Sequence, residues 1–429
     1  MSTSELLAGG IFIVIYALIV TERIHRTLAA LLGAVIVMGL GLITQHEAFS
    51  PEVVDFNVIF LLAGMMIIAN ILGKTGIFQW LAVEAVRRAE GRPYRLLVLI
   101  SLITAITSAF LDNVTTVVLL TPVTFFIAQR LGMSPTPFLI SEILASNIGG
   151  TATLIGDPPN IIIGSRMGKD FGDFLINAAP VSIFALVAYL LFARWLFRSE
   201  LAAAQTALEP EDIARLVEEE RRIEDPHLMR LGLAVLGATI VGFLLARPLG
   251  LEGATIALAG AVVLVILAKE DVHEVLRNVE WPTLLFFVGL FILVGAVVKS
   301  GLISDLAKQV LSITGGRTDL AAILVLWMSG VLSAVIDNIP YTITMVPLVQ
   351  ELGHHVDIEP LTWALLIGAD FGGNATIVGA SANVVVSSMS EARGHPITFR
   401  GYLRYGVPAT FLTMIVATLD IWLRYFVFR

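Results

Sequence analysis

Four aspartates lie inside apolar stretches of this sequence, each beside residues that interrupt a helix. Asp112 and Asp337 are each followed by an asparagine, Asp157 stands between a glycine and two prolines, and Asp370 lies two residues before a glycine pair. An ionised carboxylate is costly to bury among apolar groups, so such acids are functional candidates by default. Burial also favours the uncharged form of a carboxyl group, which suits a group that takes up and releases a proton. We therefore expect the four to bind a proton or a cation. A helix cap is the alternative role, most readily for Asp157.

Neutral oxygen and amide groups accompany these aspartates. They come from Asn113, Thr115, Thr116, Asn147, Thr151, Thr153, Asn160, Asn338, Asn374, Thr376, Ser381 and Asn383, and the adjoining backbone carries no side chain at Gly149, Gly150, Gly372 and Gly373. Lys and Arg are absent from these segments, so a multiply charged anion would meet only helix N-termini. The groups suit a neutral polyhydroxy solute or a dehydrated cation. We expect no cofactor and no resident metal, with H⁺ as the coupling ion and Na⁺ as the alternative.

The segment 146–160 is the centre of this pattern. Its three glycines and two prolines break or loosen helical hydrogen bonding. Freed backbone groups cannot stay unpaired in hydrocarbon, so such a break persists only inside protein or beside water. A loop between two helices is the alternative. A broken polar segment between apolar ones is nevertheless the pattern of a transporter's binding site, and here it occurs twice.

The composition indicates a polytopic membrane protein. Of the 429 residues, 57% are hydrophobic and only 14% are charged, which no soluble domain of this size needs. Cysteine is absent, which excludes disulfides, thiolate catalysis and cysteine metal sites. We predict spans at about 5–20, 27–43, 57–73, 138–165 and 174–197, and again at about 230–246, 252–268, 282–299, 361–389 and 405–427.

Two longer apolar runs, 95–131 and 319–350, carry an Asp-Asn pair in the middle. Each could be one long tilted helix, but that would turn an aspartate toward lipid. We predict a re-entrant hairpin instead, with the Asp-Asn pair at its tip. The polar segment 198–229 between the two sets of runs is predicted to be a cytoplasmic linker.

An internal duplication relates the two sets of runs. Asp112-Asn113 and Asp337-Asn338 lie 225 residues apart, and the segments 149–156 and 372–379 match at a separation of 223. We therefore predict an all-α polytopic membrane protein built from two repeats, 1–197 and 230–429. Each repeat has five transmembrane spans, one of them broken, plus a re-entrant hairpin, and the odd count inverts the second repeat.

The repeats are expected to converge on one site near the middle of the membrane, but they are not equal there. At the 223-residue separation, Asn147 corresponds to Asp370 and Asp157 corresponds to Ala380. Each half thus has one acid that the other lacks.

The basic residues predict the orientation. The side that holds the linker receives 19 of the 27 Lys and Arg residues under these spans, which makes it cytoplasmic and leaves both termini outside. Residues 74–94 are predicted to form an amphipathic helix at that interface.

The motifs Asp112-Asn113-Val114-Thr115-Thr116, 149–160, Asp337-Asn338-Ile339-Pro340 and 372–383 together resemble the arsenite/antimonite permease and P protein branch of the ion transporter superfamily. That superfamily also includes sodium/proton antiporters and citrate and dicarboxylate carriers. The resemblance implies a scaffold domain and a transport domain that alternate between two accessible states, often in a homodimer. Some arsenite permeases also use a separate ATPase subunit. In the sodium-coupled carboxylate carriers, the hairpin tips resemble Ser-Asn-Thr. Here the first position of that motif is Asp112 or Asp337, which favours protons over sodium as the coupling ion.

These features predict a secondary transporter of the cytoplasmic (inner) membrane that exports arsenite or antimonite, a small inorganic solute, in exchange for protons. A sodium/proton antiporter and an organic-anion carrier are the alternatives. We expect no enzyme: the Gly-x-Gly-Asp motif of intramembrane aspartyl proteases is not matched at Asp157, and no Walker motif is present. The lipid bilayer is an expected partner and nucleic acid is not.

Overall fold

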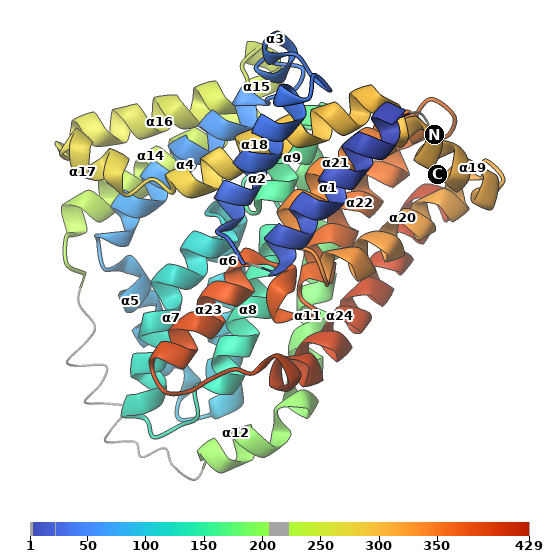
Figure 1. The fold of residues 1–429 in the computed structure, drawn as a ribbon. Coiled ribbons are helices and arrows are strands. Elements are labelled where there is room, and N and C mark those ends of the chain that lie inside the picture. Colours follow the sequence, from blue (N-terminus) through green and yellow to red (C-terminus); the bar gives the residue numbers. More distant parts are fainter. Residues whose placement is uncertain (1–2, 22, 206–222, 429) are drawn as a thin grey trace.

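The computed structural model describes residues 3–21, 23–205 and 223–428, and all regular structure in this part of the chain is helical (Figure 1). The first half contains α1 (Thr3–Thr21), α2 (Arg26–Gly39), α3 (Gln45–Ala48), α4 (Phe56–Gly73), α5 (Ile77–Ala89), α6 (Pro93–Phe110), α7 (Asn113–Arg130), α8 (Thr136–Gly150), α9 (Pro158–Met167), α10 (Phe171–Asn177) and α11 (Ala179–Leu196). After α12 (Arg198–Gln205), the second half contains α14 (Pro226–Leu244), α15 (Ala246–Leu249), α16 (Gly253–Ala268), α17 (Val272–Arg277), α18 (Trp281–Ser300), α19 (Leu302–Thr314), α20 (Thr318–Ser333), α21 (Asn338–Leu352), α22 (Ile358–Gly373), η1 (Ile377–Gly379), α23 (Ser381–Ala392), α24 (Phe399–Trp422) and η2 (Leu423–Val427).

The all-helical membrane fold is confirmed, although not every expected span is a full-length helix. Among the described residues, seven helices are long and apolar enough to cross a membrane: α1, α4, α6, α11, α14, α18 and α24. An eighth results if α19 and α20, bent by 118°, are counted as one. Helices α2 and α16 have only 14 and 16 residues; at about 1.5 Å per residue they are shorter than the roughly 30 Å hydrocarbon core. The remaining two expected spans are the broken pairs α8–α9 and α22–α23.

The packing of the helices follows an internal two-fold relation. Helix α4 packs on α16 as its counterpart α18 packs on α2, and α9 packs on α21 as α23 packs on α7. Within each half, the first hairpin arm lies along the broken span, α6 on α8 and α20 on α22. Each half is therefore completed by elements of the other.

The two hairpins enter from opposite sides. Helix α7 leads away from its tip to the end of α23, where the Arg393 guanidinium lies 5.0 Å from the centre of the Phe125 ring. Helix α21 leads to the end of α9, where Gln350 Nε2 donates to the Arg166 carbonyl (2.8 Å). In Figure 1, α9 lies in the upper part of the molecule and α23 in the lower part. Helix α6 is long enough to span, yet its tip stops beside the tip of the other hairpin, as shown below.

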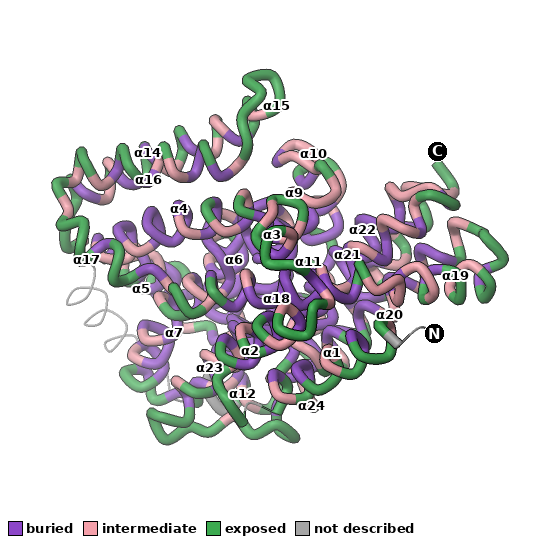
Figure 2. Tube along the Cα trace, turned by 45° about the horizontal axis from the view of Figure 1, so that its top comes forward, coloured by how far each residue is buried: buried purple, intermediate pink, exposed green. Residues whose placement is uncertain are grey.

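Burial separates the lipid-facing helices from the centre. Every residue from Pro137 to Gly150 and from Pro360 to Gly373 is buried, whereas much of α14 and α16 is exposed in Figure 2. The exposed side chains of the outer helices are themselves apolar: Leu191 and Ile266 are 70% and 67% exposed. Apolar exposure on this scale suits contact with lipid rather than water.

Two amphipathic helices flank the hairpins. Helix α5 buries Phe78 and Val83 and presents Arg87 and Arg88 near its end, in line with the interfacial helix predicted for residues 74–94. Its counterpart α19 has the same character but was not predicted from the sequence. Both termini lie together at one end of the molecule, with α12 at the opposite end (Figure 1). Of the predicted linker, 198–205 and 226–229 are helical and 206–222 lie outside the described residues.

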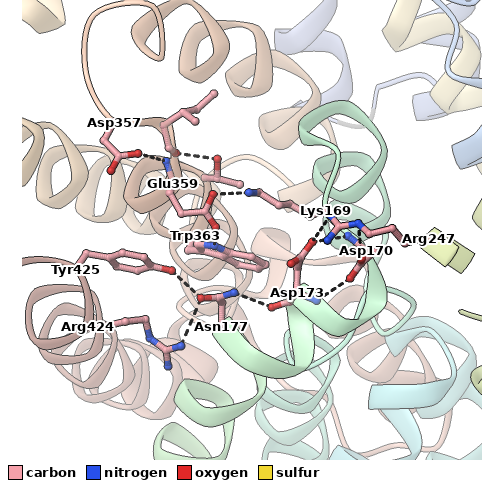
Figure 3. A network of polar contacts seen from close by, with 12 residues as sticks. Lys169, Asp170, Asp173, Asn177, Arg247, Asp357, Glu359, Trp363, Arg424 and Tyr425 are labelled. Atoms are coloured by element: carbon pink, nitrogen blue, oxygen red, sulfur yellow. Dashed lines mark hydrogen bonds and ion pairs between the residues drawn. The ribbon is translucent and has the colours of Figure 1, made fainter. Parts of the chain in front are cut away.

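A polar network fastens α10 to its neighbours at the end that holds the termini (Figure 3). Lys169 pairs with Glu359, whose other oxygen accepts from Trp363 Nε1 (2.8 Å). Arg247 Nε lies 3.1 Å from an Asp170 carboxylate oxygen, and Tyr425 donates to Asn177 Oδ1 (2.8 Å). The network joins α9 and α10 to α22, α15 and η2, away from the four aspartates.

Glycines let each hairpin lie directly on the broken span. A methyl group on Gly149 would overlap backbone atoms of Ala105 in α6, and one on Gly372 would overlap the backbone of Gly330 in α20. We predict that Gly149→Ala lowers the free energy of unfolding in detergent by about 1–3 kcal/mol, because backbone cannot yield as a side chain can. Gly237→Ala is the matched control, since a methyl group there meets open space and alanine favours helix. Equal melting temperatures for the two variants would contradict the close approach.

Candidate functional site

Each helix break is held by one asparagine. Asn160 Nδ2 donates to the carbonyls of Gly150 (2.9 Å) and Thr153 (2.6 Å), which the break leaves without helical partners. Asn383 Nδ2 does the same for Gly373 and Thr376, both at 2.8 Å. Unpaired carbonyls at this depth would each cost several kcal/mol. Asn160 and Asn383 therefore have a structural role, which is to pair the carbonyl groups at the helix breaks.

Hydroxyl groups join each hairpin tip to the adjacent break. Ser108 Oγ donates to the Ser146 carbonyl (2.8 Å), and Thr153 donates to the carbonyl of Ala109. In the second half, Ser333 Oγ donates to Ala369 O and Thr376 Oγ1 to Ala334 O, both at 2.6 Å. Gly150 and Gly373 pack against the backbone of Gly156 and Gly379. The hairpin and the broken span of each half therefore form one unit.

Asp157 lies between the tips of both hairpins. Its Oδ2 accepts from Asn113 Nδ2 of the first hairpin (2.6 Å), and Asn338 Nδ2 of the second lies 3.3 and 3.4 Å from its two oxygens. The side chain is fully buried, and no Lys or Arg pairs with it among the described residues. Neutral amide donors can stabilise a buried carboxylate, but they do not neutralise it.

Asn147 links the two broken spans. Its Oδ1 accepts from Asn113 (3.1 Å), and its Nδ2 donates to Asn374 Oδ1 and Asn383 Oδ1, both at 2.9 Å. The Thr151 hydroxyl donates to the Asn147 carbonyl one turn away (2.8 Å). The expected convergence of the two halves is therefore present as direct hydrogen bonds between their side chains.

The helix caps are made by Asp112 and Asp337, and not by Asp157, for which the sequence most readily suggested a cap. Asp157 precedes α9 but makes no capping hydrogen bond. Asp112 and Asp337 make them instead: Asp112 accepts from the Thr115 backbone N–H (3.0 Å) and from the Thr115 hydroxyl, and Asp337 accepts from the Ile339 N–H (3.0 Å). Proline at the first two positions of α9 removes the N–H groups that would otherwise need a cap.

Asp370 stands apart from the other three aspartates. It is fully buried, and neither carboxylate oxygen has a hydrogen-bond partner among the described residues. The Asp157 carboxyl group lies near it, on the other broken span. The Thr116 hydroxyl is also buried without a partner. Asp370 and Asp157 thus bring two carboxylates together with few donors between them.

Arg26 is a site residue that the sequence analysis missed. Its Nη1 donates to Ser381 Oγ (2.6 Å) and lies 3.5 Å from Asp337 Oδ2, while Ser381 also donates to Asp337 (2.7 Å). These groups line a cavity of about 200 Å³ together with Val114 and Glu280. The expectation that an anion would meet only helix N-termini is therefore wrong. Arg26 precedes Asp337 by more than 300 residues, so spacing could not reveal the contact.

Glu142 was also missed, because only aspartates beside the breaks were considered. It lies fully buried in the middle of α8, and its two oxygens accept from Thr121 Oγ1 (3.2 Å) and Thr124 Oγ1 (2.7 Å) of α7. A third side chain not foreseen is Tyr16 of α1, which donates to the Pro340 carbonyl (2.5 Å) beside the second hairpin tip. An acid inside an apolar predicted span was the available signal for Glu142.

Comparison with known proteins supports the fold and the class. Residues 16–368 match the family model described as "Citrate transporter" (CitMHS). An "uncharacterized transporter" of Mycobacterium tuberculosis is 43% identical over 429 residues and covers 99% of each chain. The "P protein" of Homo sapiens is 35% identical over 95% of this chain and 58% of its own length. Among solved structures, the Alcanivorax borkumensis YdaH transporter, whose topology is described as unusual, aligns with a TM-score of 0.57 at 15% identity, covering 94% of this chain and 99% of that one.

The amide cradle can be tested with a double-mutant cycle. Combining Asn113→Ala with Asp157→Ala should give a coupling energy of about 1.5–3 kcal/mol in detergent unfolding, as for a hydrogen bond to a charged group. The longer Asn338 contact should couple more weakly. Asn70→Ala is the control, because its amide bonds to an exposed carbonyl far along the chain. Coupling within error of the control at both positions would mean that neither amide senses the carboxylate.

Proposed function

This chain belongs to the citrate transporter (CitMHS) family, and we propose that it exports arsenite or antimonite in exchange for protons. It is a multi-pass membrane transporter, and the proposal concerns its cargo and its coupling ion. The observation that carries the proposal is Asp157, a buried carboxylate that amides from both hairpin tips hold without a cationic partner.

Proton binding at Asp157 would change how both hairpins are held. An ionised carboxylate offers acceptors to Asn113 and Asn338, and protonation converts one oxygen into a donor. The hydrogen bonds of both tips then weaken or rearrange together. Since each tip is fixed to its own broken span, a proton on one atom is felt by both halves, as alternating access requires.

The neutral groups of the site suit a neutral cargo. Amides, hydroxyls and backbone from Asn113, Asn147, Asn374 and Thr376 surround the crossing of the breaks. The trivalent acids of arsenic and antimony are uncharged and polyhydroxylated near neutral pH, so donors and acceptors without charge suffice to hold them. A chain without cysteine also avoids the tight thiolate complexes that would slow release of a thiophilic metalloid.

An organic-anion carrier is the second candidate, and Arg26 is the observation that favours it. The guanidinium faces the cavity of about 200 Å³ and pairs with Asp337. A guanidinium in this position can also bind a carboxylate of the cargo through charge-assisted hydrogen bonds. A sodium/proton antiporter is the third reading, with Na⁺ bound by the same carboxylates.

Transport in everted membrane vesicles separates these three functions. With an acid lumen, we expect uptake of arsenite that a protonophore abolishes, and Asp157→Asn should reduce it to background because the exchangeable proton is lost. Asp305→Asn is the matched control, since that carboxylate lies far from the breaks, is partly exposed and pairs with Lys308 at 3.0 Å. Citrate uptake that depends on Arg26, or proton release driven by sodium alone, would replace arsenite with the corresponding alternative.

We place the protein in the inner membrane with both termini outside. Single cysteines within 200–225 should react with impermeant reagents only from the cytoplasm, and ones near Ser2 or Arg429 only from outside, because basic residues favour the cytoplasmic side. The cysteine-free chain is the background control. Labelling of both regions from one side would overturn the inverted repeat. A second copy of the chain and a separate ATPase subunit are further proposed partners, and crosslinking in membranes would identify either.

A further inference from the structure

Three buried acceptors where the two halves meet have no hydrogen to accept. They are the two carboxylate oxygens of Asp370 and the amide oxygen Oδ1 of Asn160, and none has a hydrogen-bond partner among the described residues. Both side chains are 0% exposed. An acceptor left unpaired in such a place costs about 1–3 kcal/mol, and more if it is charged. What all three lack is a hydrogen-bond donor.

The two-fold relation shows where that donor belongs. Asp370 occupies the position of Asn147, and Asn160 occupies that of Asn383, each 223 residues apart. In the first half, Asn147 Nδ2 donates to Asn383 Oδ1 and to Asn374 Oδ1, both at 2.9 Å. The same relation sets the Asp370 carboxyl opposite Asn160 Oδ1 and opposite Thr151, the counterpart of Asn374.

The Thr151 hydroxyl does lie beside Asp370, where its interaction with the carboxyl group is felt. It supplies no hydrogen, however, because it donates to the Asn147 carbonyl at 2.8 Å. One link between the halves thus pairs an amide donor, Asn147, with an amide acceptor, Asn383. The equivalent link pairs a carboxyl group, Asp370, with an amide acceptor, Asn160.

We propose that Asp370 carries a proton in this conformation and donates it to Asn160 Oδ1, forming a second proton site of the transport cycle. The proton takes the place of the Nδ2 hydrogen that Asn147 provides in the other half. Asn160 has both of its own hydrogens committed to Gly150 O and Thr153 O, so its remaining oxygen is free to accept.

The neighbourhood favours a proton over a metal ion. Five cavities in the described part of the protein are lined by residues other than Asp370 and Asn160, and a proton needs no space of its own. The charged group that faces Asp370 is Asp157 of the other broken span, on which Asp337 and Asp112 also act. From α24, the Tyr402 hydroxyl donates to the Asn374 carbonyl (3.1 Å). Arg26 is occupied at Asp337.

Loss of this proton would separate the two broken spans. Asn160 belongs to the start of α9 and Asp370 to the end of α22, so the proposed hydrogen bond joins the halves. Without the proton, a carboxylate faces an amide oxygen and the Asp157 carboxylate, all of them acceptors. The first half keeps its amide link through Asn147 at any pH, so only one of the two links between the halves would respond to protons.

Asp370→Asn is the informative variant, because asparagine already performs this role at position 147. It should fold, and it should retain the hydrogen bond to Asn160 without the ability to release it. In infrared difference spectra between acid and alkaline pH, the wild type should show a protonated-carboxyl band that shifts in D₂O. Asp370→Asn should lack this band, and the exposed-site control Asp305→Asn should keep it.

Thermal melting in detergent gives a second readout that requires no transport. A carboxyl group that is protonated in the folded protein but ionised in the unfolded chain loses its stabilising effect as pH rises, until the folded protein also releases the proton. The wild type should therefore lose melting temperature toward alkaline pH more steeply than Asp370→Asn. Unchanged infrared bands and equal pH slopes would overturn the proposal. Stabilisation of the wild type by sodium at constant pH, lost in Asp370→Asn, would also overturn it by identifying a sodium site.

The inference deepens the proton coupling proposed above and rests on it only for its effect on transport. In proteoliposomes, Asp370→Asn should move fewer protons for each cargo molecule than the wild type. If the wild type moved no arsenite at all, the proposed cargo would fail while the infrared and melting results still decided the state of Asp370.

Discussion

Unpaired backbone at two helix breaks is the constraint on which this structure depends. A chain that interrupts a membrane helix must find new donors for the carbonyl groups it releases. Here one asparagine supplies both hydrogens at each break, Asn160 for Gly150 and Thr153, and Asn383 for Gly373 and Thr376. Serine and threonine hydroxyls then fix the neighbouring hairpin to the same backbone. The amides and hydroxyls of the polar centre therefore serve first to pair the backbone of the broken helices. The carboxylates lie among groups whose backbone hydrogen bonds are already made.

The hydrogen bonds between backbone and side chains are similar in the two halves, whereas the charged groups are arranged differently. The hydrogen bonds that repair the breaks occur in pairs, whereas three of the charged groups have no counterpart: amides from both hairpins donate to Asp157, no amide in the described part of the chain donates to Asp370, and Arg26 reaches only the second hairpin. Two similar halves can hold two similar backbones, but two equal charges at one centre would repel each other. The two halves thus share the same backbone arrangement, while substitutions at matched positions place the charged groups differently in each half.

The sequence predicted what depends on local pattern and internal repetition. Glycine and proline located both breaks, the Asp-Asn pairs located both hairpin tips, and the constant separation between matched residues related the halves. It did not predict contacts between distant segments. Arg26 meets Asp337 because α2 begins beside the second hairpin tip, and nothing in the spacing of either residue shows this. A cap was the alternative role for each aspartate, most readily for Asp157, yet Asp112 and Asp337 make the caps and Asp157 does not, because the prolines of α9 remove the N–H groups that a cap would bind. Helix α19 was not foreseen because its apolar residues alternate with polar ones, which left it in the gap between the predicted runs 282–299 and 319–350.

The separation between matched residues also changes once, from 225 residues at the hairpin tips to 223 at the breaks. The change of two residues falls between those points, where α7 has 18 residues and α21 has 15. The loops after these helices lie at opposite ends of the molecule, far from the crossing of the halves. Since the duplication, the chain has therefore accepted a change of length where a hairpin leaves the protein, while the residue spacing within each hairpin tip and within each break has been retained. Tolerance to insertion and deletion thus follows distance from the membrane centre rather than distance along the sequence.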